Sequence, residues 1–433
     1  MSSTPTLRRR SHGALRSRAT HPTARIVAAP PPDKVTPRVV PVVRIPPLFW
    51  GVALPVFALS LLGLVMVLSA SSVPRRGSDM SSWYYFGRHA IWLSIGTVAL
   101  VVANKVDYRH WLRLAPIVLG VAVAGLVLVL LPTPLQHSVN GAKRWLGSGG
   151  WGGQPSEIAK LGLVLWLAAL LDRNADGVRD WRRSIAPAFG VLMVLGVLIL
   201  AEPDLGTVIL LAAVTFIMLV VAGSRLDVLA GLAVPSAAVA VGFSMIGYRK
   251  GRMLAFLDPW KHARDWGYQT LQSQVGLADG GLFGVGLGNS RAKWGFLPEA
   301  HTDFIYAIIG EEFGLIGCLV VLGAFVCLFV AGMRVSLRSK NRAAMLMGVG
   351  VSSWIGIQAL VNIGVVIGAL PNKGITLPFV SYGGSSLMVT MFATGLLLQV
   401  ARRSGEPAVA AAPRRRKPAP VAAPRAGARG AWR

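Results

Sequence analysis

The chain has 433 residues, of which 53% are hydrophobic and only 14% are charged, against about 25% charged in a typical soluble domain. Its formal net charge is +26, but 18 of the 44 Lys and Arg residues lie before Trp50 or after Ala401. A water-soluble fold could not cover its surface with the few charges that remain between these points. Composition therefore excludes a soluble protein and predicts an all-α integral membrane protein.

Ten apolar runs predict membrane-spanning helices, each of which needs about 20 residues. They are Leu48–Ser71, His89–Ala103, Leu114–Leu131, Ile158–Leu171, Ile185–Ala201, Leu205–Ala222, Val228–Gly247, Phe304–Met333, Ala344–Leu370 and Pro378–Ala401. The second run is short, and we expect it to extend back through Trp83, Tyr84 and Tyr85, whose rings suit the membrane interface. The fifth and sixth runs meet at the turn signal Glu202-Pro203-Asp204.

Basic residues in the short loops predict the orientation. Loops on the side of the termini hold twelve Lys and Arg, whereas short loops on the other side hold six. Because basic loops stay in the cytoplasm, both termini are expected there, and the loop 248–303 between spans seven and eight is expected outside. The membrane domain then covers 48–401. The Arg-, Pro- and Ala-rich tails, 1–47 and 402–433, are expected to be disordered and to attract anionic membrane lipids rather than nucleic acid.

The loop 248–303 is unusually long for a connection without a purpose. Five glycines lie between Gly280 and Gly288, and its basic residues are Arg249, Lys250, Arg252, Lys261, Arg264, Arg291 and Lys293. One interpretation is a surface linker. The other is a substrate-handling loop, in which basic side chains and backbone N–H groups at the Gly turns bind a phosphate.

Acidic residues near a bilayer are candidate functional positions. Glu157 and Lys160, three residues apart, can form an ion pair or belong to a polar pathway. Glu202 and Asp204 at their turn either face water or cap the next helix. Glu311 and Glu312 lie inside span eight and need a partner, a proton or a wet cavity, among which the sequence does not decide.

The segment Gly295–Phe304 is the most informative. Pro298 can open a helix that continues into span eight, which would place Glu299 and Asp303 on one face at its outer end. Two carboxylates close to His301 suit proton transfer. The alternative is that Glu299 or Asp303 only caps the helix N-terminus.

No sequence motif indicates a bound metal or nucleotide. Cys318 and Cys327 are nine residues apart in one apolar run, which places them on opposite faces of a helix. A disulfide or a shared metal ion between them is therefore not expected.

Several long segments resemble the SEDS family of bacterial cell-wall proteins, which comprises FtsW, RodA and SpoVE. They are NGAKRWL (140–146), QPSEIAKL (154–161), GYQTLQSQVGLADGGLFGVGLGNS (267–290), LPEAHTDFIYAIIGEEFG (297–314) and LPFVSYGGSS (377–386). The resemblance covers roughly 48–401, in the order of the family and with its ten spans. The stretch Glu299-Ala300-His301 is similar to the division branch, FtsW, since elongation members more often have a basic residue at Ala300. The tails resemble actinobacterial members in composition.

The resemblance implies a peptidoglycan glycosyltransferase that polymerises lipid II at the division septum of the plasma membrane. Its expected partners are a class B penicillin-binding protein and other division proteins. The essential aspartate of the family falls on Asp303, which would act as general base in an inverting single displacement. Glu299 and His301 would assist at the substrate site, and Ser381 would line a lipid groove or serve helix packing. A divalent cation, Mg²⁺ or Mn²⁺, could share the charge of the leaving pyrophosphate. The candidate clamp residues are Lys143, Arg144, Arg249, Lys250, Arg252, Arg291 and Lys293.

Two other classes of function are compatible with the residues. The first is a transporter that flips the lipid-linked precursor, which would use the intramembrane acids and Lys160 as a polar pathway. The absence of an obvious internal repeat weakens that interpretation. The second is a scaffold for a division complex that acts through its tails and outer loop.

Overall fold

The computed structural model describes residues 46–72, 82–134, 136–139, 142–147 and 152–404. The tails therefore lie outside the described residues, except for 46–47 and 402–404, and the prediction that they are disordered stays a prediction. The helices are α1 Pro47–Ala70, α2 Ser82–Lys105, α3 Tyr108–Leu130, α4 Pro155–Arg173, α5 Ala186–Ala201, α6 Leu205–Ala222, α7 Leu226–Ser244, α8 Tyr248–Leu257, α9 Tyr268–Gly280, α10 Ile305–Leu337, α11 Arg342–Val366 and α12 Gly384–Ser404.

Nine helices within the described residues are long and apolar enough to cross a membrane: α1, α2, α3, α5, α6, α7, α10, α11 and α12. The prediction of a helical membrane protein with many spans is confirmed. The backward extension of the second run is also confirmed, because α2 begins at Ser82. The helix α4 has 19 residues and covers the fourth predicted run, but it carries four charged side chains, Glu157, Lys160, Asp172 and Arg173.

The connection between α3 and α4 contains a β-hairpin that the all-α prediction missed. Strands β1 (Gln136–Val139) and β2 (Ala142–Leu146) pair in antiparallel fashion, with an irregularity between His137 and Ser138. The last residue of β2, Leu146, also exchanges two backbone hydrogen bonds with Gly153, of 3.0 and 2.8 Å. Four- and five-residue strands carry no hydropathy signal long enough to stand out from a loop.

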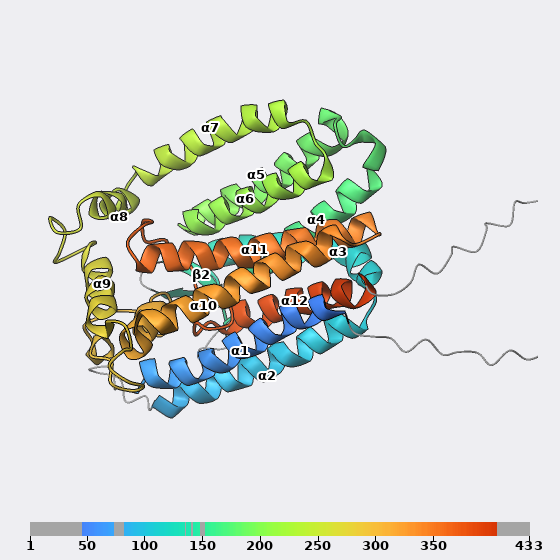
Figure 1. The fold of residues 1–433 in the computed structure, drawn as a ribbon. Coiled ribbons are helices and arrows are strands. Elements are labelled where there is room, and N and C mark those ends of the chain that lie inside the picture. Colours follow the sequence, from blue (N-terminus) through green and yellow to red (C-terminus); the bar gives the residue numbers. More distant parts are fainter. Residues whose placement is uncertain (1–45, 73–81, 135, 140–141, 148–151, 405–433) are drawn as a thin grey trace, which may run out of the picture. The chain divides into compact units, whose positions relative to one another are not determined.

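Helix α11 lies at the centre of the helical bundle, and most of its residues are buried. It contacts α4, α6, α9, α10 and α12, while α12 packs along α2, α3 along α4, and α1 along α10. By contrast, α7 lies at the edge and buries only Leu229 and Ser244 (Figure 1). The core therefore consists of the helices that flank α10 and α11.

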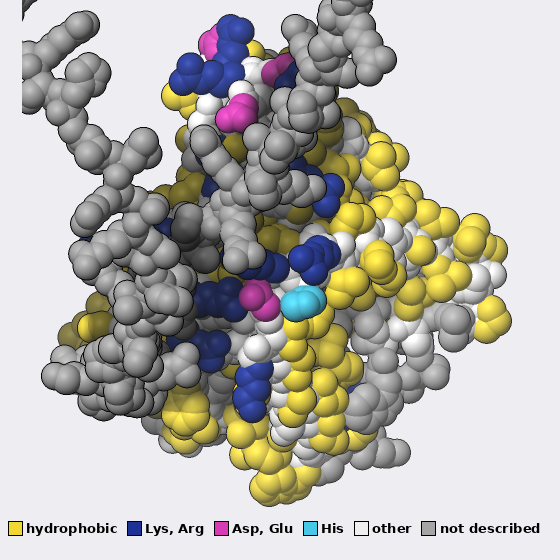
Figure 2. Space-filling model, turned by 90° about the vertical axis from the view of Figure 1, so that its right-hand side faces the viewer, with side chains coloured by type: hydrophobic (Ala, Val, Ile, Leu, Met, Phe, Trp, Pro, Cys, Tyr) yellow, Lys and Arg dark blue, Asp and Glu magenta, His cyan; other side chains and the backbone are white. Residues whose placement is uncertain are grey.

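The two ends of the bundle differ in character. Helices α8 and α9 and the start of α10 lie at the left-hand end in Figure 1, whereas the connections α2–α3, α4–α5 and α10–α11 lie at the right-hand end. Figure 2 views that right-hand end and shows Lys and Arg side chains gathered on it. Three of the connections predicted to be rich in basic residues therefore lie at the same end of the bundle (Figure 1).

The segment 248–303 is largely structured. It contains α8, α9 and a short 3-10 turn at Ala292–Trp294, and α9 packs against α10. The linker interpretation of this segment is therefore wrong, because much of the segment is helical and packs onto the bundle.

Candidate active site

Asp303 lies in a turn just before α10, and not in a helix that starts at Pro298 as the sequence predicts. The physical reason is Glu299, whose φ of 56° lies in the left-handed region that interrupts a right-handed helix. The amides of Thr302 and Phe304 both donate to the Glu299 carbonyl, at 3.1 and 3.3 Å. Helix α10 begins at Ile305 with no side-chain cap. The capping role for Glu299 or Asp303 is therefore wrong.

Hydrogen bonds from Asn362 and Ser381 fix the backbone of the Asp303 turn, and Gly374 lies against the carboxylate itself. The Asn362 amide donates to the Asp303 carbonyl at 2.8 Å, and the Ser381 hydroxyl donates to the Thr302 carbonyl at 2.6 Å. On the other side lies Gly374, whose φ of 63° favours glycine. A Cβ on Gly374 would lie 3.4 Å from Asp303 Oδ2, so the carboxylate sits directly against this backbone.

The surroundings of Asp303 raise its pKa from 3.8 to about 7. Burial contributes most, because it disfavours the charged form, and the neighbouring Glu299 carboxylate adds to the rise. Arg252 and Arg144 act in the opposite direction, and Asp204 raises the pKa slightly further. A carboxyl group that titrates near neutral pH is suited to accept and release a proton.

A small cavity of about 20 Å³ is lined by three cations, Arg249, Arg252 and Lys373, and Lys373 directly precedes Gly374, the residue that faces the Asp303 carboxylate. Burial lowers the pKa of the Lys373 ammonium, and the two guanidinium groups lower it further. Cations held this close to one another favour an anion between them. The other lining residues are Pro203, Leu205, Gly206, Ser244, Met253, Pro371 and Asn372.

Arg144 holds the turn between α5 and α6. Its guanidinium donates to the carbonyls of Glu202 and Pro203 at 2.9 and 2.7 Å, and it lies 3.8 Å from Asp204 Oδ2. Asp204 accepts from the amide and the hydroxyl of Thr207 at 3.0 and 2.9 Å, so its predicted capping of the next helix is confirmed. Glu202 and Asp204 are both buried, and the alternative that they face water is wrong. Burial, with the neighbouring Asp204, raises the pKa of Glu202 to about 8.

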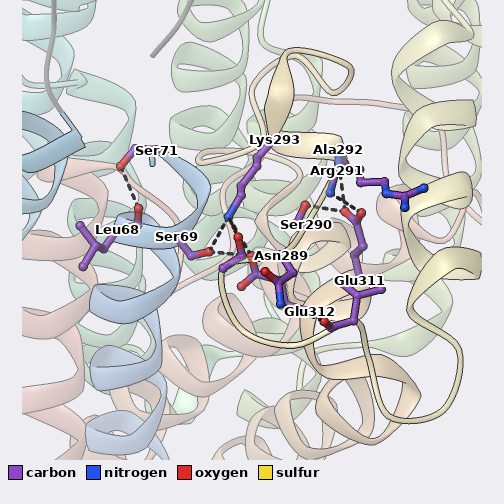
Figure 3. A network of polar contacts seen from close by, with 12 residues as sticks. Leu68, Ser69, Ser71, Asn289, Ser290, Arg291, Ala292, Lys293, Glu311 and Glu312 are labelled. Carbon is purple, nitrogen blue, oxygen red and sulfur yellow. Dashed lines mark hydrogen bonds and ion pairs between the residues drawn. The ribbon is translucent and has the colours of Figure 1, made fainter. Parts of the chain in front are cut away.

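Glu311 and Glu312 have protein partners, which answers the question that the sequence left open (Figure 3). Glu311 accepts hydrogen bonds from the Ser290 hydroxyl and from the amides of Arg291 and Ala292. Glu312 accepts from the Ser69 hydroxyl of α1 at 2.6 Å and pairs with the Lys293 ammonium at 3.4 Å. Lys293 is buried in this network, so its predicted place in a pyrophosphate clamp is wrong.

Two of the five glycines between Gly280 and Gly288, Gly280 and Gly284, pack closely against the backbone of α10. The amides of Val285 and Gly286 donate to the carbonyls of Glu311 and Glu312, at 2.9 and 3.1 Å, where α10 is broken at Gly314. A Cβ on Gly284 would clash with the Glu312 carbonyl oxygen, so only glycine permits this approach. The amides of Val285 and Gly286 are satisfied within the protein and are not free to bind a phosphate. Phosphate binding by other backbone groups of these Gly turns stays a prediction.

The remaining predicted residues lie further from the cavity or have structural contacts. Lys143, Lys250 and Arg291 are exposed and none of them lines it. The His301 ring lies 5.1 and 5.7 Å from the rings of Tyr85 and Tyr382. Ser381 is buried, and its hydroxyl also accepts from the Leu377 amide at 2.8 Å, which favours the packing role over the lipid groove.

Sequence reasoning missed Lys373 and Asn362. Lys373 is one of only six cations in the short loops on the side opposite the termini, and this scarcity could have marked it as a candidate. Asn362 is a polar residue in an apolar span, a feature that marks functional or packing positions in membrane helices.

Among the described residues no three His, Cys, Asp or Glu side chains converge into a metal site built by the protein alone. Mg²⁺ is usually held by one or two carboxylates together with substrate phosphates, so the predicted divalent cation at the pyrophosphate stays a prediction. The cavity itself is lined by cations. Cys318 is buried and Cys327 is exposed, and both are free thiols.

Comparison with known proteins gives the family. The sequence profile of the FtsW/RodA/SpoVE family, described as "Cell cycle protein", matches residues 50–406. The chain belongs to the FtsW/RodA/SpoVE family. It is 40% identical to the probable peptidoglycan glycosyltransferase FtsW of Geobacter metallireducens, over 80% of this chain and 92% of that protein. It is 38% identical to stage V sporulation protein E of Bacillus subtilis, over 79% of this chain and 94% of that one.

Solved structures of this family share the fold. One is a chain from a structure described as the structural coordination of polymerization and crosslinking by a peptidoglycan synthase complex, with a TM-score of 0.69 and 30% identity over 82% of this chain and 98% of that one. Another is the rod shape determining protein RodA of Thermus thermophilus, with a TM-score of 0.59 and 27% identity over 82% and 96%.

Proposed function

We propose that the chain is a peptidoglycan glycosyltransferase that polymerises lipid II into glycan strands. The observation that carries the proposal is Asp303, a half-buried carboxyl group with a pKa of about 7. It faces Gly374, which follows Lys373, and Lys373 lines a small cavity together with Arg249 and Arg252. The names of the FtsW relatives support the same activity.

Asp303 acts as the general base. The 4-hydroxyl of the acceptor GlcNAc attacks C1 of the donor MurNAc, and its proton passes to the Asp303 carboxylate as the new C–O bond forms. A base with a pKa near the working pH combines a sizeable ionised fraction with enough basicity to take the proton. After the reaction the proton returns to water, which restores the base. One displacement inverts the configuration at C1, so no covalent intermediate with the protein is needed.

The cations of the cavity stabilise the leaving group. The bond between C1 and the phosphate oxygen breaks, and undecaprenyl pyrophosphate leaves with the electron pair. Arg249, Arg252 and Lys373 line one cavity, and fixed cations at the point where negative charge develops lower the barrier. Arg144 contributes indirectly, because it holds the α5–α6 turn that supplies the wall around Pro203.

The proposed topology has ten spans, namely the nine apolar helices among the described residues and α4, which is the fourth span in chain order. The two charges in the first two turns of α4 neutralise each other, since Lys160 Nζ lies 2.7 Å from Glu157 Oε2, and both are buried. We place both termini and the basic face of Figure 2 in the cytoplasm. Residues 248–303, the cavity and Asp303 then lie on the outer side, where lipid II presents its sugars.

We assign the protein to septal cell-wall synthesis, in complex with a class B penicillin-binding protein that crosslinks the strands. The supports are the FtsW names of the relatives and the likeness to a chain from a peptidoglycan synthase complex. The motif around Ala300 favours the same branch.

Reconstitution of the purified protein with lipid II and its partner tests this function. Glycan strands are the expected product. Movement of lipid II across the bilayer without polymer would instead identify a transporter. Neither activity, in a protein that still binds its partner, would identify a scaffold.

A further inference from the structure

Two buried amide side chains lie on one face of α11. Gln358 and Asn362 are four residues apart, which places them one turn from each other, and their exposed fractions are 1% and 2%. Amides buried in a membrane protein are costly unless they are hydrogen-bonded. The groups to which they donate lie in the two segments that form the candidate active site.

Asn362 joins these two segments. Its amide nitrogen donates to the Asp303 carbonyl at 2.8 Å and to the Ile375 carbonyl at 2.7 Å. A carboxamide has two N–H donors, and both are used here. One side chain therefore links the turn of the general base to the 371–377 segment, in which Gly374 faces the Asp303 carboxylate and Lys373 lines the cavity.

Gln358, one helical turn before Asn362, also holds the 371–377 segment. Its amide nitrogen donates to the Thr376 carbonyl at 3.0 Å. Its carbonyl oxygen accepts from Lys160 Nζ at 2.9 Å and from Trp354 Nε1 at 2.8 Å, which fixes the orientation of the amide. The Glu157–Lys160 pair thus ends a chain of contacts that runs from α4 through Gln358 to the active-site segment.

We propose that Asn362 is a positioning residue that sets the separation of the Asp303 carboxylate and the Lys373 ammonium, and that Gln358 with the Glu157–Lys160 pair supports it. The inference rests on the proposed glycosyltransferase function. General base and leaving-group cation act on opposite ends of one displacement, so their separation must match the distance between attacking and leaving oxygens. A misplacement of about 1 Å is enough to cost about a hundredfold in rate.

The test replaces Asn362 by Leu, which has a similar size and no donor. We expect kcat for lipid II polymerisation to fall about a hundredfold with KM unchanged, because Asn362 holds the catalytic groups and does not contact the substrate. Gln399 of α12 supplies a matched control. It is also buried, and its amide donates to the carbonyls of Asn104 and Val106 at 3.1 and 2.7 Å. Gln399→Leu should lower the unfolding temperature comparably and leave kcat unchanged.

Wild-type kcat in Asn362→Leu would overturn the inference, and so would an equal loss of kcat in Gln399→Leu. If Asn362→Leu does not fold, Asn362→Ser retains one donor and should lower kcat by an intermediate factor, and a wild-type kcat there would overturn the inference as well. The wild-type protein is assayed in parallel. Its failure to make glycan would refute the proposed function itself, which is a different result from wild-type activity in the Asn362 variants.

Discussion

The pH dependence of polymerisation follows directly from the environment of Asp303. A general base works only when it is ionised, so activity should rise with pH through its pKa of about 7. The ionised fraction of such a group is about one-tenth at pH 6 and about nine-tenths at pH 8. We therefore expect kcat/KM to increase about tenfold between these two values. An unperturbed Asp, with a pKa of 3.8, would give no change over this range.

Two substitutions should move the pH at which activity rises, the acidic limb of the pH profile, in opposite directions. Glu299→Gln removes a negative charge that raises the pKa of Asp303, so the limb should move to lower pH. Gln also keeps an acceptor for the Thr302 hydroxyl, which lies 3.1 Å from Glu299 Oε2. Arg252→Gln removes a positive charge that lowers the pKa, so its limb should move to higher pH, with a lower maximum because a leaving-group cation is lost.

The assay measures the turnover of fluorescent lipid II by the purified protein with its partner between pH 5.5 and 8.5. The shifts between variants separate the titration of the enzyme from that of the substrate, because the substrate is the same throughout. The assignment of the base would be refuted if wild-type activity does not change from pH 5.5 to 8.5. It would also be refuted if neither variant shifts the acidic limb of the pH profile.

Three further predictions concern the membrane domain and the tails. Single neutralisation of Glu157 or Lys160 should cost about 3–5 kcal/mol and appear as poor expression, whereas the double replacement should recover part of the loss; normal expression of the single variants would contradict a structural pair. A cysteine at Ala263, in a background without cysteines, should react with an impermeant maleimide added to whole cells or spheroplasts, and labelling only after lysis would reverse the topology. A chain spanning 45–405 should polymerise lipid II at the rate of the full chain, and a folded, partner-bound form without activity would show that the tails are required.

Hydropathy was sufficient to predict the helices but not where the outer segments begin and end. The predicted helix starts at Pro298 and Pro378 were wrong for the same reason: Glu299 and Phe379 adopt φ values of 56° and 65°, and the helices begin only at Ile305 and Gly384. Such backbone conformations depend on tertiary contacts and leave no periodic pattern in the sequence.

The candidate site was predictable only in part. Asp303 could be found because it lies where an apolar span meets a basic loop, and its motif resembles that of a known family. Lys373 and Asn362 join the site only through the packing of α10 against α11, across 59 or more residues of sequence. Lys293 was misassigned because its burial comes from a tertiary contact with Glu312, 19 residues away, which local sequence does not reveal.

The most direct test of the account compares the wild-type protein with Asp303→Asn, each purified with the proposed class B partner and supplied with lipid II. Asn is nearly isosteric with Asp, and no hydrogen bond from Asn362 is lost because that bond goes to the backbone carbonyl. We predict normal expression and partner binding, with polymerisation reduced about a hundred- to ten-thousandfold, as is typical for loss of a general base. Glycan synthesis by Asp303→Asn at the wild-type rate would contradict the assignment of Asp303 as the base.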